Sequence, residues 1–180
     1  MSNKIACMCG LSLGLALSAI GLSNVSAQEK CKVSEGAEVA KSTYTQQHTL
    51  DVGDVPGHQV RIFEIHRTYP NDKPNCEGLK RTESWERGYS NYIDWNGPTT
   101  TFGVTTLENG DKIFTQVVGT SQTTISPEGV KNSTFTGVTR YTGGTGKYKG
   151  IRGFLRVNTK FDPEKNINLP QIEGEYWLEK

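Results

Sequence analysis

The strongest constraint in this sequence is a repeated pattern of short strand-like stretches separated by turn residues. Segments rich in Thr, Val, Ile, Phe and Tyr alternate with clusters of Gly, Pro, Asn and Asp, and helical periodicity is almost absent. About eight such stretches suit an antiparallel barrel or a sandwich, and eight strands can close around one small ligand. We therefore expect an all-β fold, an eight-stranded antiparallel barrel with a central ligand cavity. The strands are expected at residues 43–52, 58–69, 83–95, 99–107, 111–124, 133–141, 151–161 and 171–179.

The amino-terminal segment has the pattern of an export signal. Lys4 precedes an apolar run at residues 11–22, and a small-residue cleavage site ends at Ala27. The run is too short to span a membrane, which needs roughly 20 residues. We expect residues 1–27 to be a signal peptide, residues 28–180 to form one domain, and the mature protein to be secreted or periplasmic.

The charge balance gives no reason to expect a nucleic-acid or membrane partner. Loss of Lys4 with the signal leaves 19 basic residues against 19 acidic ones. A neutral protein has no electrostatic attraction to nucleic acid or to an anionic membrane. His48, His58 and His66 lie on adjacent predicted strands, but no Glu-x-x-His or Cys-x-x-Cys spacing accompanies them. We therefore expect no metal and no cofactor.

Two of the four cysteines remain after removal of the signal. Cys7 and Cys9 belong to the signal, and Cys31 and Cys76 do not. An exported protein with two cysteines is expected to pair them. The alternative, a reactive thiol or a metal pair, has no neighbouring His or Cys spacing to support it. The expected disulfide links the amino-terminal arm to the loop after the second predicted strand.

The stretch YTGGTGKYKGIRG, Tyr141–Gly153, is rich in glycine and in basic residues. A phosphate-binding loop would need these glycines immediately before a helix. The residues after Gly150 instead alternate as in a strand, and no Gly-Lys-Ser/Thr occurs. A sheet corner explains the glycines better, because they allow positive φ and close backbone approach. The expected structural turn glycines are Gly143, Gly144, Gly146, Gly150 and Gly153.

Two segments carry a resemblance to a known family. The run GGTGKYKGIRG resembles the Gly-Gly-Thr-Gly-x-aromatic-x-Gly-x-x-Gly signature of the dirigent and allene oxide cyclase barrels, with Tyr148 in the aromatic place. Residues 59–74 are similar to an early strand of the cyclases, because Phe63-Glu64-Ile65 matches the aromatic-Glu-Ile core. The resemblance implies an eight-stranded antiparallel barrel with a ligand cavity. It also implies a possible homo-oligomer, since related barrels often associate.

The resemblance also implies catalytic residues. In the cyclases the matching glutamate lines the cavity and helps to delocalise charge as an epoxide opens, while an asparagine helps to hold a water. Carried over, Glu64 would be the carboxylate, and His66, which replaces the asparagine, would hold the water or act as an acid. Alternation places both on one face of their strand. The alternative is that Glu64 and His66 face water while Phe63 and Ile65 fill the barrel.

Aromatic residues on two predicted strands are candidates for ligand binding. Trp85, Tyr89 and Trp95 share one face of the predicted strand 83–95, and Glu175 and Trp177 share a face of the last strand. Such an aromatic stripe can also be ordinary core.

Two functions fit this sequence. The first is an exported barrel that binds a small hydrophobic or phenolic ligand and acts as a cyclase or isomerase through cavity shape, with Glu64 and His66. The second is a non-catalytic carrier or scavenger of such a ligand. Hydropathy and residue spacing do not name the ligand.

Overall fold

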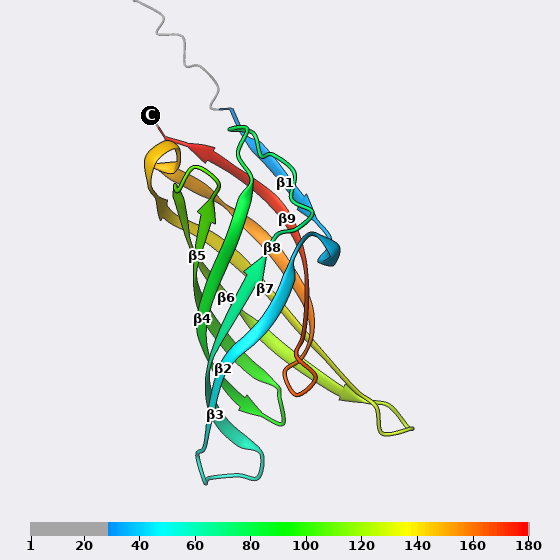
Figure 1. Ribbon diagram of the computed structural model, residues 1–180. Coiled ribbons are helices and arrows are strands. Elements are labelled where there is room, and N and C mark those ends of the chain that lie inside the picture. The colour runs from blue at the N-terminus through cyan, green and yellow to red at the C-terminus, as the bar shows by residue number, and fades with distance from the viewer. Residues whose placement is uncertain (1–28, 180) are drawn as a thin grey trace, which may run out of the picture.

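The computed structural model describes residues 29–179, which form one antiparallel sheet of nine strands (Figure 1). The order in the sheet is β1-β9-β8-β7-β6-β5-β4-β3-β2, so consecutive strands from β2 to β9 are neighbours. In this part of the chain no helix has the length and apolar character needed to cross a membrane. The predicted signal peptide, residues 1–27, lies outside the described residues. The elements are β1 (Cys31–Glu35), η1 (Ala37–Val39), β2 (Lys41–Asp51), β3 (His58–Thr68), β4 (Arg81–Ile93), β5 (Gly97–Leu107), β6 (Lys112–Ile125), β7 (Lys131–Gly144), η2 (Gly146–Tyr148), β8 (Ile151–Asp162) and β9 (Ile167–Leu178).

All of the predicted strands are present, but the expected closed eight-stranded barrel is wrong. The sheet has nine strands, and its hydrogen-bonded ladder does not close between β2 and β9. The reason is the additional strand β1, which pairs with β9 from Cys31 opposite Tyr176 to Glu35 opposite Ile172. This pairing occupies the edge of β9 over residues 172–176, so that part of the edge is not free for a closing strand.

The two edges of the sheet nevertheless approach each other through side chains. The Tyr44 backbone N–H on β2 donates to the Asn166 Oδ1 atom, in the turn before β9, at 2.7 Å. The Asn168 Nδ2 atom on β9 donates to the Tyr44 hydroxyl at 3.1 Å. The sheet is therefore strongly curled, as Figure 1 shows, and it has a concave and a convex face.

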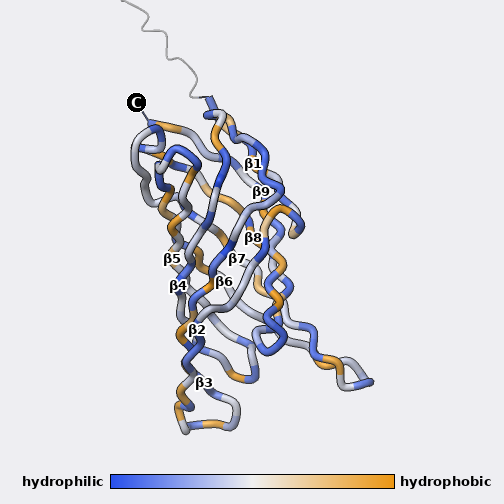
Figure 2. The backbone as a smooth tube through the Cα atoms, in the orientation of Figure 1, coloured by the Kyte–Doolittle hydropathy of each residue, from blue (hydrophilic) through white to orange (hydrophobic). Residues whose placement is uncertain are grey.

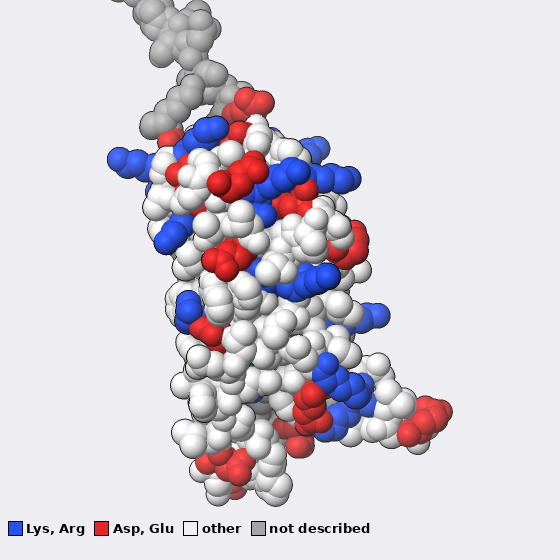
Figure 3. All heavy atoms as spheres, viewed as in Figure 1, with Lys and Arg blue, Asp and Glu red and all other residues white. Residues whose placement is uncertain are grey.

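The core lies on the concave face, as the alternation of buried and exposed residues along the strands shows. On β8, Ile151, Leu155, Val157 and Phe161 are buried, while the residues that alternate with them are exposed. The same alternation of apolar and polar residues is visible along the strands in Figure 2. The face of the molecule shown in Figure 3 carries acidic and basic side chains intermixed, most densely toward the end where β1 lies.

The glycine-rich stretch connects strands β7 and β8. Of the five predicted turn glycines, Gly146 and Gly150 lie in this connection, whereas Gly143 and Gly144 end β7 and Gly153 lies in β8. Gly146 has φ +51° and Gly150 has φ +79°, conformations that favour glycine. The short helix η2 within the turn buries Tyr148 completely. A Cβ atom at Gly150 would lie 2.7 Å from the carbonyl oxygen of Glu179. Both the backbone angle and the close approach of the chain after β9 therefore require glycine at this position.

We expect Gly150→Ala to lower the free energy of unfolding by more than about 1 kcal/mol, because it adds a steric clash to an unfavourable φ. Gly110→Ala is the matched control, because Gly110 also has positive φ (+85°), but a Cβ atom there would meet nothing within 4 Å. Its cost should be about 1 kcal/mol, from the backbone angle alone. Urea unfolding measures both, and a Gly150→Ala protein as stable as wild type would contradict the turn assignment.

The predicted disulfide is confirmed. Cys31 and Cys76 are bonded, with their Cα atoms 6.0 Å apart and a sequence separation of 45 residues. The bond attaches β1 to the loop at residues 69–80, so it fixes both the additional strand and that loop.

Replacing both cysteines by serine should lower the free energy of unfolding by up to about 4 kcal/mol, the chain-entropy value for a loop of this length. Thermal unfolding of the wild type with and without reductant provides an independent measurement. Identical midpoints in the two conditions would show that the bond contributes nothing to stability.

Candidate functional site

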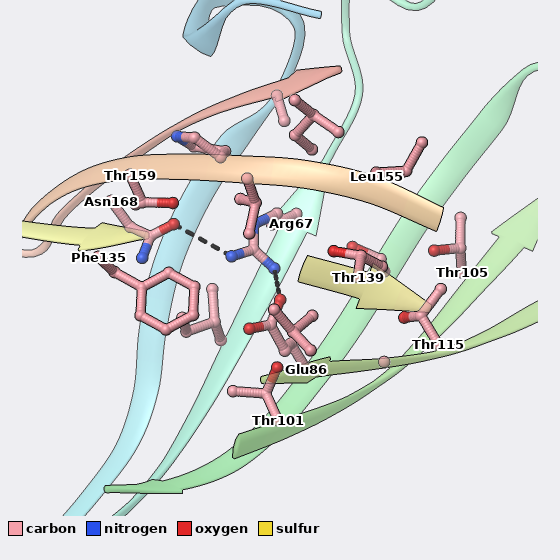
Figure 4. A pocket seen from close by; sticks show the side chains of 18 of the residues that line it. Arg67, Glu86, Thr101, Thr105, Thr115, Phe135, Thr139, Leu155, Thr159 and Asn168 are labelled. Atoms are coloured by element: carbon pink, nitrogen blue, oxygen red, sulfur yellow. Dashed lines mark hydrogen bonds and ion pairs between the residues drawn. The ribbon is translucent and has the colours of Figure 1, made fainter. Parts of the chain in front are cut away.

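The concave face of the sheet lines a cavity of about 190 Å³. One wall carries the short side chains of β4 and β5, among them Ser84, Thr101 and Thr105, and the wall across from it carries Leu155 and Phe161 of β8. Figure 4 shows hydroxyl groups and apolar side chains facing the same space. The cavity therefore has a mixed lining in which apolar groups alternate with hydrogen-bonding ones.

An ion pair between Arg67 and Glu86 lies in this cavity. The Arg67 Nη1 atom donates to Glu86 Oε2 at 2.6 Å, and its Nη2 atom donates to Asn168 Oδ1 at 3.1 Å (Figure 4). Burial alone would lower the pKa of Arg67, but the negative charge of Glu86 raises it above the ordinary value. The Nε atom of Arg67 is buried and has no hydrogen-bond partner among the described residues. The pair is thus charged, enclosed and incompletely satisfied.

A second arginine, Arg61, lines the cavity further along β3. This residue is 3% exposed, and its guanidinium lies 4.5 Å from the ring centre of Phe63, 5.2 Å from that of Tyr44 and 5.6 Å from that of Trp95. It donates a hydrogen bond to Gln47 Oε1. Burial lowers the pKa of Arg61 below its ordinary value, but an arginine remains protonated at neutral pH.

A third arginine, Arg81, lies where the cavity meets the loop at residues 69–80. It forms ion pairs with Asp72 on that loop and with Glu35 on β1, the latter at 2.8 Å. Burial alone would raise the pKa of Asp72, but hydrogen bonds from Arg81 lower it below the usual range. A second hollow of about 650 Å³ lies between the loop and β1, and shares Tyr141 with the lining of the cavity. Arg81 therefore joins the disulfide in holding the loop over this end.

The two residues expected to be catalytic do not point into the cavity. Glu64 pairs with Arg87 at 2.7 Å on the convex face, and Arg87 has 61% of its side chain exposed. The His66 ring also lies on that face, with its Nε2 atom 3.0 Å from Glu83 Oε2. Neither Glu64 nor His66 lines the cavity.

The alternation of β3 explains this placement. Phe63 and Ile65 are buried and line the cavity, together with Arg61 and Arg67 on the same side of the strand. The side chains between them must then face outward. The alternative in which Phe63 and Ile65 fill the interior is the arrangement found.

Most of the expected ligand-binding residues also lie outside the cavity. Trp85 borders it, but its ring stacks on His66 with a centroid distance of 4.2 Å. Tyr89 is 52% exposed. Glu175 and Trp177 both contact Lys30, through an ion pair and through the indole face.

Trp95 does not line the cavity, but its ring lies close to two residues that do. Its ring lies 6.4 Å from that of Phe161, which lines the cavity, and close to Arg61. Of the five residues expected to bind a ligand, Trp95 is therefore the one whose ring lies beside the interior arginine.

The polar residues that do line the cavity were not among the sequence candidates. They include Arg61, Arg67, Glu86 and Asn168. The sequence did carry a signal for Arg61 and Arg67, since they share one face of the predicted strand with Phe63 and Ile65. A charged residue in phase with buried apolar ones indicates an interior site.

Comparisons with models of known protein families, with curated proteins and with solved structures give no match. The resemblance to the dirigent and allene oxide cyclase barrels therefore depends on the two sequence segments alone.

We expect Glu86→Gln to lower the free energy of unfolding by about 3 kcal/mol, because it leaves the buried Arg67 charge without its counter-ion. Glu64→Gln is the matched control. It breaks a pair of similar length, 2.7 Å against 2.6 Å, whose arginine is 61% exposed and can be solvated by water, and it should change stability by no more than about 1 kcal/mol. Denaturant unfolding distinguishes the two, and equal effects would contradict the assignment of the inner and outer faces.

Proposed function

We propose that this protein binds a small, mostly apolar molecule in the cavity, as an exported domain with a barrel-like wall. The observation that carries the proposal is the space of about 190 Å³ among apolar side chains and hydroxyl groups. An apolar cavity of about 150 Å³ accommodates one benzene molecule. A molecule with a single ring, or a slender chain of similar volume, therefore suits this space. The Cys31–Cys76 bond is consistent with an oxidising compartment.

The lining favours a molecule that also carries a hydrogen-bonding group, such as a phenol. Thr101 is 3% exposed, and its hydroxyl has no partner among the residues described. Arg67 likewise has a buried N–H without an acceptor in the described part of the chain. Buried polar groups of this kind gain most from a partner, because no water compensates them. A purely apolar ligand would leave them unsatisfied.

The geometry supports binding better than catalysis of the cyclase type. The residues that the resemblance assigns to catalysis, Glu64 and His66, lie on the convex face. The carboxylate that does line the cavity, Glu86, is already paired with Arg67. A carrier or scavenger needs no free acid or base, so it is the function we propose.

A larger side chain in the cavity should weaken ligand binding. Val117 is buried and lines the cavity, while its neighbour Val118 is 54% exposed on the convex face. We expect Val117→Phe to weaken the binding of phenol and p-cresol by at least about tenfold, and Val118→Phe to leave it unchanged.

Isothermal titration calorimetry on the disulfide-bonded protein measures this difference, and thermal unfolding confirms that both variants are folded. Binding that is equal in the two variants would place the ligand elsewhere. Absence of binding of either phenol to the wild type would count against a phenolic ligand.

A further inference from the structure

Arg61 is distinguished from the other cavity arginines by the absence of a carboxylate partner. Arg67 pairs with Glu86, and Arg81 pairs with two acids. Within residues 29–179 no ion pair involves Arg61, although it is the least exposed of the three. Its positive charge is therefore held inside the protein without a fixed negative charge beside it.

The elements packed around Arg61 supply only neutral groups. Strand β2 contributes the Gln47 amide and the Tyr44 ring. On β4, the residue directly opposite Arg61 in the ladder is Ser90, which is completely buried and whose hydroxyl has no partner in the described structure. Directly opposite residues share a face of the sheet, so this hydroxyl lies on the concave side with Arg61.

The aromatic rings around Arg61 compensate its charge only in part. A ring face attracts a cation electrostatically but accepts no hydrogen bond in the plane of the guanidinium. The guanidinium has several in-plane N–H donors, and Gln47 accepts from one of them. The Tyr44 side chain also accepts from the guanidinium, but Gln47 and Tyr44 are both neutral. A buried cation without a carboxylate partner favours an anion that can reach it.

We infer that the ligand of the cavity is a small carboxylate, held with its anionic group at Arg61 and its apolar body against Phe63, Val117 and Phe161. This inference rests on the proposed function, since it names the class of molecule that the same cavity binds. A planar carboxylate matches the planar guanidinium and can accept two parallel hydrogen bonds from it. The apolar residues named line the cavity together with Arg61.

The test compares molecules of the same shape and different charge. Benzoate, benzamide and benzylamine share one ring and differ in the charge of the attached group, and hexanoate with hexanamide repeats the comparison on a chain. We expect benzoate to bind the wild type at least about tenfold more tightly than benzamide, and benzylamine to bind most weakly. The chain pair should show the same order.

Substitutions at Arg61 test whether the preference for the carboxylate over the amide depends on its charge. Arg61→Gln removes the charge and should make benzoate and benzamide bind equally, while Arg61→Lys keeps the charge and should retain part of the preference. Arg87→Gln is the matched control, because it removes an arginine charge from the convex face, and it should behave as wild type. Thermal unfolding reports whether each variant is folded, and the wild-type preference tests the inference even where Arg61→Gln does not fold.

The outcomes separate the inference from the proposed function. If benzamide and hexanamide bind the wild type as tightly as the corresponding anions, or if folded Arg61→Gln keeps the preference, the carboxylate inference is wrong and cavity binding stands. If neither the anions, the amides nor phenol bind, the proposed function itself is wrong. A preference for the anions that is lost in Arg61→Gln and kept in Arg87→Gln supports both.

Discussion

Short side chains on the concave face of two adjacent strands keep the interior of this curled sheet open. On β4 the residues that line the cavity include Ser84, and on β5 they include Thr99, Thr101 and Thr105. A Cβ atom at Gly88 would lie 2.4 Å from Thr101 Cγ2, so the sheet is closely packed here while its side chains reach only a short way inward. A cavity follows from this choice of residues, because the larger apolar groups of β8 cannot fill the remaining space alone.

The sheet uses the same ionic chemistry on its two faces with different physical consequences. On the convex face, the arginine that pairs with Glu64, Arg87, is exposed, and solvent and salt weaken the pair. On the concave face, Arg67 and Glu86 have lost most of their water, so removing either one leaves a buried charge without a counter-ion and destabilises the protein. The arginine of this outer pair can therefore be solvated without its partner, whereas the inner charges lie in the lining of the cavity.

Much of the fold could be predicted from the sequence because strands and turns are local features. Alternation and turn residues located β2 to β9, and the positive φ of Gly150 followed from its glycine-rich turn. Strand β1 could not be located in the same way, because it has five residues and pairs with β9 at the other end of the chain. Cys31 was the local sign that this segment is attached to the domain.

The candidate site was harder to predict because both faces of β3 are chemically mixed. The outward face carries Glu64 and His66, and the inward face carries Arg61 and Arg67 beside Phe63. Polarity along the strand cannot tell these faces apart. Arginine–glutamate pairs with β4 form on both faces, and which face points inward depends on how the folded sheet curls.

The distribution of partners among the three arginines gives the cavity two electrostatically different ends. Arg81 lies at the start of β4 and is held by Asp72 and Glu35, whereas Ser90, opposite Arg61, lies nine residues further along the same strand. At about 3.3 Å per residue, this separates the two ends by about 30 Å. At the loop end the positive charge of Arg81 is compensated by Asp72 and Glu35, whereas the guanidinium of Arg61 has no carboxylate partner among the described residues. An anionic ligand of the kind we infer would therefore be held at the Arg61 end of the cavity, because the arginine at the loop end already has two carboxylate partners.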